Sequence, residues 1–227
     1  MSPARPGGFC AGLWDAAQPI YDAILAHPFV AGLTDGSLPR DAFAFYVVQD
    51  AHYLRGYARA LSLVSAHASD ASDVAMFATH AAEAIAVERA LHTELLAGLG
   101  IDPAAVDHGA SAPATAAYVD HLLATCATGS YADGIAAVLP CYWIYAEVGR
   151  HLLAAGSPDA QYARWIETYG GEEFAAVVRA VLDTAERIGT ALGDDDRARA
   201  RALYAHGARY EWMFWDAAYR RQDWPRF

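Results

Sequence analysis

The sequence predicts an all-α fold, a compact bundle of helices. Apolar residues recur every three or four positions along nearly the whole chain, which is the helical period. Much of the hydrophobic content of 55% is alanine, a residue that favours helices. The alternation of polar and apolar residues that marks strands is absent. With 227 residues, we expect one domain, 1–227, with a sizeable core.

Caps and helix breakers set the expected boundaries. Ser37 would cap a helix with Pro39 in its first turn, and Ser130 with Asp133 forms a capping-box pattern. The stretch 102–113 contains two prolines and is expected to be a loop between helices. The expected helices are one through 13–25 that ends before Pro28, one opened by 37–41, one from the Ser130 cap to 155, and those at 70–97, 114–127, 159–168, 172–192 and 194–221.

Charge and composition exclude several classes of partner. A net charge of −11 argues against nucleic acid and anionic membranes, which both require basic patches. The sequence has no apolar run of membrane-spanning length and no secretion signal, so we expect a cytoplasmic protein. Its three cysteines, Cys10, Cys126 and Cys141, lack disulfide or zinc spacing and are expected to be reduced thiols.

Asp50 interrupts an aromatic helix face. It shares that face with four rings at the same helical spacing, Phe43, Tyr46, Tyr53 and Tyr57. Burying a carboxylate among rings is costly unless it is hydrogen-bonded. Asp50 is therefore either a functional group or a structural acid that tyrosine hydroxyls or a neighbouring arginine, Arg55 or Arg59, would satisfy.

Glu211 repeats this pattern near the end of the chain. Its helix face otherwise carries Tyr204, Gly207, Phe214, Trp215 and Ala218. A carboxyl in an apolar pocket has a raised pKa, which suits general acid–base chemistry. The alternative is a structural acid paired with an arginine elsewhere.

Cys141 follows Pro140 inside a predicted helix. The proline leaves the Ala136 carbonyl without its amide partner, so we expect a kink that widens the space beside Cys141. Tyr145 lies on the same face, and aromatic walls suit a flat ring. A thiol and two carboxyl groups on tyrosine-rich faces would form a nucleophile with acid–base partners. The alternative is an inert core thiol, which is common for free cysteine.

A metal site is a competing interpretation. Two helices each carry a glutamate and a histidine four residues apart, and bundles hold di-iron sites through such ligands. The usual Glu-x-x-His spacing of three is missing, so we expect no metal and no other cofactor. The residues in question are Glu88, His92, Glu147 and His151, with His80 and Glu83 nearby.

Five motifs in order resemble the TenA, or thiaminase II, family over nearly the whole length. They are His27-Pro28-Phe29-Val30, the run from Val47 to Leu54 (VVQDAHYL), the run from Leu139 to Gly149 (LPCYWIYAEVG), Trp165-Ile166-Glu167-Thr168-Tyr169-Gly170-Gly171, and Tyr210-Glu211-Trp212-Met213-Phe214-Trp215. The thiol at Cys141 places the chain with the cysteine-containing branch. The resemblance implies a haem-oxygenase-like fold without haem, usually a homotetramer.

The same resemblance implies an activity in thiamin salvage. The small-molecule substrate would be 4-amino-5-aminomethyl-2-methylpyrimidine, hydrolysed to its 5-hydroxymethyl counterpart, with thiamin cleavage to pyrimidine and thiazole as an associated activity. A pyrimidine- or thiamin-binding protein without catalysis, and a di-metal oxidase on this scaffold, remain alternatives.

Residue roles follow from the matching positions. Cys141 matches the nucleophile, Asp50 the carboxylate that binds the amidine edge of the pyrimidine, and Glu211 the acid–base residue. Tyr53 matches the tyrosine that positions this glutamate, and Tyr145 the one near the nucleophile.

The resemblance extends to the walls of the site. Tyr118, Tyr169 and Phe214 match pocket positions that contact the ring or donate a hydroxyl. His52 and Ala146 depart from the pattern at positions where tyrosine occurs in relatives, which bears on fine specificity more than on chemistry.

Overall fold

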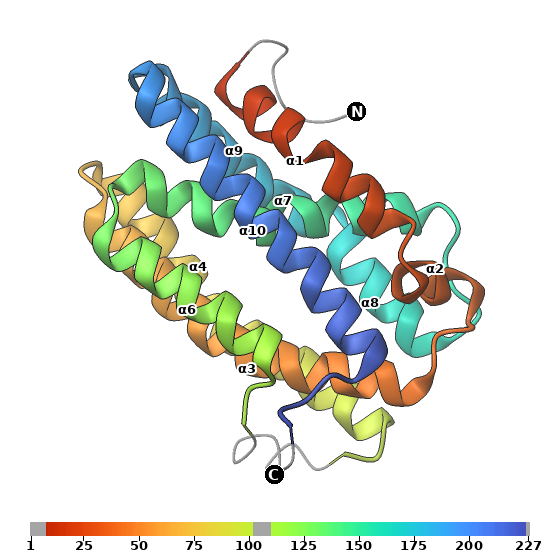
Figure 1. The fold of residues 1–227 in the computed structure, drawn as a ribbon. Helices are drawn as coiled ribbons and strands as arrows, with labels where there is room; N and C mark the ends of the chain where they lie inside the picture. The colour runs from red at the N-terminus through yellow and green to blue at the C-terminus, as the bar shows by residue number, and fades with distance from the viewer. Residues whose placement is uncertain (1–7, 102–109, 226–227) are drawn as a thin grey trace.

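All regular secondary structure in the described part of the chain is helical. The computed structural model describes residues 8–101 and 110–225, apart from the side chains of residues 87–94. Its helices are α1 (Phe9–Leu25), α2 (Pro28–Asp35), α3 (Arg40–His67), α4 (Ala71–Gly98), α6 (Pro113–Thr128), α7 (Tyr131–Leu153), α8 (Ala160–Gly170), α9 (Glu172–Thr190) and α10 (Asp194–Arg220), as Figure 1 shows. None of these helices combines the length and apolarity that a membrane span requires.

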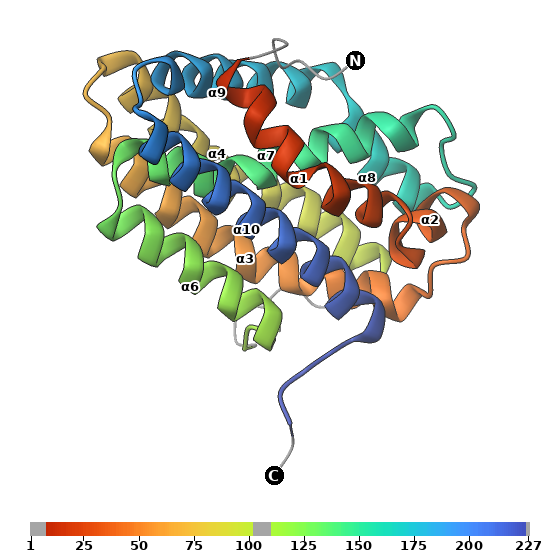
Figure 2. The same cartoon turned by 45° about the horizontal axis from the view of Figure 1, so that its top comes forward.

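Four helices form the centre of the bundle. Each of α3, α6, α7 and α10 packs against the other three, so side chains from all four can meet in one core. The remaining helices surround this group: α4 lies along α3, α1 along α10, and α8 and α9 against α7 (Figure 2). This arrangement places the aromatic stripes of the central helices face to face.

Most helix starts agree with the sequence-based expectation. The Ser130 side chain accepts from the Asp133 amide at 3.2 Å, and the Asp133 carboxylate accepts from the Ser130 amide at 2.8 Å, which confirms the capping box. Asp70 caps α4 through the Ser72 amide. The predicted loop at 102–113 lies largely outside the described residues, and α6 begins at Pro113.

Near the N-terminus one expectation is confirmed and one is wrong. The first helix ends before Pro28 as expected, at Leu25. Pro28 also starts α2, which the sequence pattern does not predict, and proline suits the first turn of a helix. The His27 ring accepts from the Phe29 amide at 3.1 Å and caps this helix. Ser37 does not cap α3, which begins at Arg40 with Pro39 at the cap position.

The two helix faces that carry Asp50 and Glu211 are buried as expected. Asp50 is 4% exposed and Glu211 is 1% exposed, so both carboxyl groups lie inside the core. Their stripe partners on α3 and α10 are also buried: Phe43, Tyr46, Tyr53, Tyr57, Tyr204, Gly207, Phe214, Trp215 and Ala218. Pro140 lies inside α7, which continues through it to Leu153.

Glycine allows α7 and α8 to cross backbone against backbone. A Cβ at Gly149 would lie 2.5 Å from the carbonyl carbon of Tyr169 and from the nitrogen of Gly170. Those atoms belong to the main chain of α8, so the clash could be relieved only by moving the helix. The contact therefore fixes where Tyr169 meets the bundle.

Gly149→Ala should destabilise the protein by about 1–3 kcal/mol, because overpacking forces the two helices apart. The measurement is thermal unfolding followed by circular dichroism. Gly12→Ala in α1 is the matched control: its Cβ would meet only the Arg201 side chain, at 3.6 Å. That variant should be neutral or more stable by up to about 1 kcal/mol, since alanine favours helices. Equal melting temperatures for wild type and Gly149→Ala would contradict the crossing.

Candidate active site

The predicted site residues gather where the central helices meet. Asp50 and Tyr53 come from α3, Tyr118 from α6, Cys141 and Tyr145 from α7, Tyr169 from α8, and Glu211 and Phe214 from α10. Tyr145 is a common neighbour of the reactive groups. Burial raises the pKa of Tyr145 most, and the next contributions come from the charges around it, those of Tyr46, Glu211, Asp50 and Cys141. The thiol and both carboxyl groups therefore face one tyrosine.

Glu211 carries a buried, hydrogen-bonded carboxyl. The Tyr118 hydroxyl donates to its Oε1 at 2.6 Å. Burial raises the pKa of Glu211 to about 8, with the Tyr118 bond acting in the opposite direction and the Asp50 charge adding to the rise. At neutral pH this carboxyl therefore holds a proton, as a general acid must.

The hydrogen bond to Glu211 adds a residue to the expected positioning of this acid. The resemblance implies that Tyr53 positions the glutamate, and the direct hydrogen bond in the structure comes from Tyr118. Tyr53 lies behind that donor and packs its ring against Tyr118, at 4.9 Å between centroids, and against Phe214, at 5.8 Å. Spacing along α3 could not reveal this, because the partner belongs to another helix.

Asp50 lies close enough to Glu211 to affect its ionisation. Repulsion between the two carboxylates raises the pKa of Glu211, in addition to the larger effect of burial. Asp50 also contributes to the raised pKa of Tyr145 on α7. The two acids thus lie near each other in the core, where the charge of Asp50 disfavours ionisation of Glu211.

Tyrosines surround Cys141. The thiol is half-buried, and its negative charge would raise the pKa of five hydroxyls, each already raised more strongly by burial. These are the hydroxyls of Tyr53, Tyr57, Tyr118, Tyr142 and Tyr145. Tyr57 and Tyr142 were not expected as neighbours of the thiol, although Tyr57 belongs to the Asp50 stripe and Tyr142 directly follows Cys141.

The other two cysteines are in different surroundings. Cys10 and Cys126 are 2% and 1% exposed, and none of the three cysteines is in a disulfide. Burial raises the pKa of Cys126 to about 12 and that of Cys10 far above its usual range, where Glu186 adds to the rise. Both are therefore inert thiols at neutral pH, as expected from their sequence context.

A second aromatic layer holds Tyr145 in place. The Trp165 indole donates to the Tyr46 hydroxyl at 3.1 Å, and that hydroxyl donates to Tyr145 at 3.4 Å. The Tyr46 ring stacks on Trp215 at 5.2 Å, and Tyr169 packs against Tyr145 at 5.0 Å. Tyr145 is thus held by contacts that connect α3, α8 and α10.

A tight contact sets the register of α10 on α7. A Cβ at Gly207 would lie 2.8 Å from Cγ of Pro140, so the Pro140 ring of α7 packs directly against the α10 backbone there. Gly207 precedes Glu211 by about one helical turn, and Pro140 directly precedes Cys141. This contact therefore positions the acid relative to the thiol.

The competing metal site finds no support among the described residues. No group of three potential ligands occurs in that part of the chain. The Glu147 carboxylate pairs with Arg150, and the His80 ring bonds the Tyr142 hydroxyl. The side chains of Glu88 and His92 lie outside the described residues.

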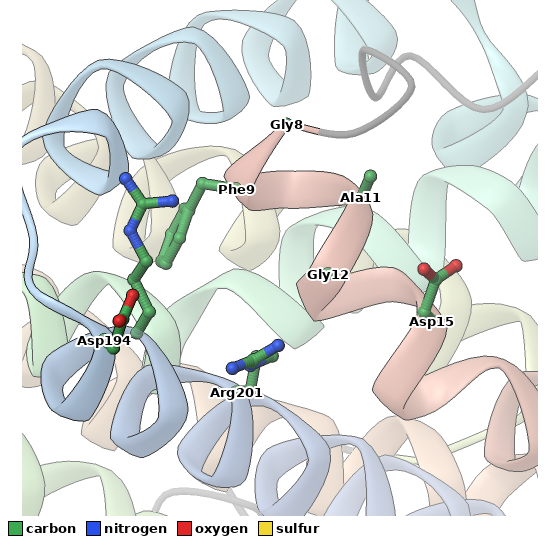
Figure 3. Close-up of a pocket in the computed structure, with 8 residues that line it drawn as sticks. Gly8, Phe9, Ala11, Gly12, Asp15, Asp194 and Arg201 are labelled. Atoms are coloured by element: carbon green, nitrogen blue, oxygen red, sulfur yellow. The ribbon is translucent and has the colours of Figure 1, made fainter.

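A surface hollow of about 350 Å³ lies elsewhere, between the starts of α1 and α10 (Figure 3). It is lined by Gly8, Phe9, Ala11, Gly12, Asp15, Asp194, Arg197 and Arg201, none of them a predicted site residue. The Arg197 guanidinium donates to the carbonyls of Leu192 and Thr190 at the end of α9. Arg197 therefore satisfies backbone carbonyls at the C-terminal end of α9.

Comparison with known families decides the relationship. The model of the TENA/THI-4/PQQC family matches residues 14–221. The chain belongs to this family. The resemblance to the TenA family is thereby confirmed, and so is the all-helical fold. The fold matches that of a TenA homologue from P. horikoshii OT3 with a TM-score of 0.86 and 30% identity, over 94% of this chain and 99% of that one. A Shewanella denitrificans domain with a haem-oxygenase-like fold matches with a TM-score of 0.74 at 18% identity, over 93% and 92% of the two chains.

Two curated relatives of this TenA-like chain differ in length. The aminopyrimidine aminohydrolase of Bacillus subtilis is 34% identical, over 92% of this chain and 89% of that protein. The thiamine biosynthesis multifunctional protein ThiED of Corynebacterium efficiens is 41% identical over 99% of this chain, which spans only 30% of that longer protein.

Glu211→Gln should change how stability depends on pH. The folded-state pKa of Glu211, about 8, lies above its ordinary value of 4.5. Unfolding therefore releases a proton between these pH values, and this contribution to stability, complete below pH 4.5, is lost as pH rises through 8. Glutamine stays neutral, so the variant should gain on the wild type by up to roughly 1.4 kcal/mol per pH unit.

Urea unfolding at pH 5 and pH 8 measures this difference. The advantage of Glu211→Gln over the wild type should be larger at pH 8. Parallel stability curves for the two proteins would show that Glu211 titrates in the folded state as it does in the unfolded chain.

Proposed function

We propose that this chain hydrolyses 4-amino-5-aminomethyl-2-methylpyrimidine to 4-amino-5-hydroxymethyl-2-methylpyrimidine and ammonia, in thiamin salvage. Cleavage of thiamin to its pyrimidine and thiazole would be an associated activity of the same site. One observation carries the proposal: a half-buried thiol and two buried carboxyl groups, from three helices, lie near one buried tyrosine, Tyr145.

The relatives support this reaction class. Full-length aminopyrimidine aminohydrolases match over 89% and 97% of their own lengths at 34% identity. The site needs no cofactor in this scheme, because the thiol and the acids supply the chemistry. The longer ThiED protein contains further sequence, since this chain spans only 30% of its length.

Binding would use Asp50 and the aromatic walls. The Asp50 carboxylate would accept charge-assisted hydrogen bonds from the 4-amino group and the adjacent protonated ring nitrogen. Tyr145, Tyr169 and Phe214 would contact the flat ring, since aromatic pairs stack favourably. These contacts would place ring carbon C6 at the thiol.

Covalent catalysis would then divide one difficult displacement into easier steps. The Cys141 thiolate adds to C6, and the ring becomes rich in electrons. Those electrons expel the amine from the exocyclic carbon once Glu211 has protonated it. Water adds to the exocyclic methylene and gives its proton to Glu211, and the thiolate leaves C6. Glu211 is suited to the first of these roles because its pKa of about 8 keeps it protonated at neutral pH.

The remaining expectations complete the proposal. We propose a single domain over 1–227, a homotetramer and a cytoplasmic location. Large apolar side chains stay exposed on the isolated chain, including Ile85, Leu153 and Met213, and a subunit interface would cover such residues.

Cys141→Ala and Glu211→Gln should each lower kcat for the aminomethyl pyrimidine by roughly a thousandfold or more, because each removes a group that acts in the transition state. Asp50→Asn should weaken substrate binding and raise KM. Ammonia release measures the reaction, and a parallel assay with thiamin ranks the two substrates.

Cys126→Ala is the matched control, since it removes a thiol that is buried on α6 and should leave turnover near normal. Near-normal turnover of Cys141→Ala would make the nucleophile assignment wrong. Tight binding of the pyrimidine by the wild type, without product, would instead favour a binding protein.

A further inference from the structure

A histidine on α4 reaches the surroundings of the thiol from outside the central helices. The Nδ1 atom of His80 lies 3.0 Å from the Tyr142 hydroxyl oxygen, and the two ring centroids are 5.7 Å apart. His80 is half-buried, whereas Tyr142 is 5% exposed. The pair therefore joins the partly exposed side of the bundle to its core.

Tyr57 connects the His80–Tyr142 pair with Cys141. The rings of Tyr142 and Tyr57 meet edge to face with centroids 5.7 Å apart, and interaction with the Tyr57 hydroxyl lowers the pKa of Tyr142, against the larger rise due to burial. Interaction with the Cys141 thiol adds to the raised pKa of Tyr57, which burial dominates. The Tyr57 hydroxyl donates to the Val138 carbonyl at 3.0 Å.

The imidazole of His80 is neutral at neutral pH. Burial lowers the pKa of His80 below 6.5, and Glu83, three residues along α4, acts in the opposite direction. Glu83 is exposed and would stabilise the ring once it is charged. His80 is thus an unprotonated base beside a carboxylate that favours its charged form.

Among the described residues, His80 and Cys141 each lie near titratable groups from more than one helix. His80 faces Tyr142 from α7 and Glu83 from its own helix. The hydroxyls around Cys141 are those of Tyr53 and Tyr57 from α3, Tyr118 from α6, and Tyr142 and Tyr145 from α7, with Glu211 of α10 bonded to Tyr118. Within this set, His80 is the base that is neutral at rest and joined to the thiol through hydroxyls.

We propose that His80 is a positioning residue that takes up the thiol proton of Cys141 through Tyr142 and Tyr57. The proposal deepens the proposed function, on which its catalytic meaning rests. In the resting arrangement the thiol donates to the Tyr57 oxygen, Tyr57 donates to the Val138 carbonyl, and Tyr142 donates to His80 Nδ1.

In the active arrangement each of these hydrogens points towards the sulfur. His80 Nδ1–H donates to Tyr142, Tyr142 donates to Tyr57, and Tyr57 donates to the thiolate. The S–H bond breaks, its electron pair stays on sulfur for the bond to C6, and one proton is gained by the imidazole. When the thiolate later leaves C6, the same proton can return. The two ends therefore titrate as a coupled pair.

The pH dependence of Cys141 alkylation by iodoacetamide tests this proposal without turnover. Thiolate is the reacting form, and the two other thiols are inert by burial, so mass spectrometry should find one adduct. In His80→Gln and in Tyr142→Phe, alkylation at pH 7 should slow by about tenfold, which corresponds to one unit in the midpoint of the profile. Rates should converge with the wild type near pH 10.

The double variant and a matched histidine sharpen the test. Because both changes break one path, the double variant should be no slower than either single variant. His121→Gln replaces another half-buried histidine whose pKa burial lowers, on α6, and should leave the profile unchanged. Unchanged profiles in the two variants, an equal slowing at every pH, additive effects, or the same shift in His121→Gln would each overturn the proposal.

This readout separates the proposal from the proposed function. A shifted alkylation profile in a protein that releases no ammonia would make the proposed reaction wrong and leave the proton path intact. Normal ammonia release with an unshifted profile would do the reverse. Tyr142→Phe keeps the buried ring, and His80→Gln changes a half-buried side chain, so both should melt near the wild type.

Discussion

The hydrogen bond from Tyr118 to Glu211 is the interaction on which the candidate site depends. A carboxyl that is 1% exposed among aromatic rings would be costly without a partner, and this hydroxyl supplies one at 2.6 Å. The Tyr118 ring is held by stacking on Tyr210, with centroids 5.1 Å apart, which fixes the direction of the donor. Burial then leaves Glu211 protonated at neutral pH beside Asp50. The hydrogen bond thus offsets the cost of burying Glu211, while burial keeps this carboxyl protonated and able to donate.

The tyrosines give this core a character that an aliphatic bundle would lack. Their rings exclude water and match a flat substrate, while their hydroxyls are dipoles that can turn as charge moves. Burial keeps those hydroxyls protonated, so the tyrosines around Cys141 act as hydrogen-bond partners rather than as charges. The close contact of Gly207 with Pro140 holds the acid-bearing helix against the thiol-bearing helix. Close helix packing and hydroxyls that can reorient therefore occur together around Cys141 and Glu211.

Periodicity predicted the buried stripes, because the spacing of three and four residues alone decides which side chains share a helix face. Asp50 and Glu211 stood out for this reason, and both lie in the core. The sequence could not reveal which hydroxyl bonds Glu211, because Tyr118 is 93 residues away and its distance depends on the packing of α6 against α10. The sequence pattern indicates His80 only as a possible metal ligand, because its contact with Tyr142 exists only once α4 and α7 are folded. Helix α2 was missed because Pro28 both follows one helix and starts the next.

Infrared difference spectroscopy on the titrated protein tests the central claim most directly, namely that Glu211 is a neutral acid at physiological pH. The wild type should show the carbonyl band of a protonated carboxyl at pH 6.5 that disappears as pH rises through about 8. The band should be missing from Glu211→Gln, and in Tyr118→Phe it should persist to higher pH, because the hydrogen bond that lowers the pKa is gone. A Glu211 band that vanishes near pH 4.5 would contradict the account, since it would place a carboxylate where the structure requires an acid.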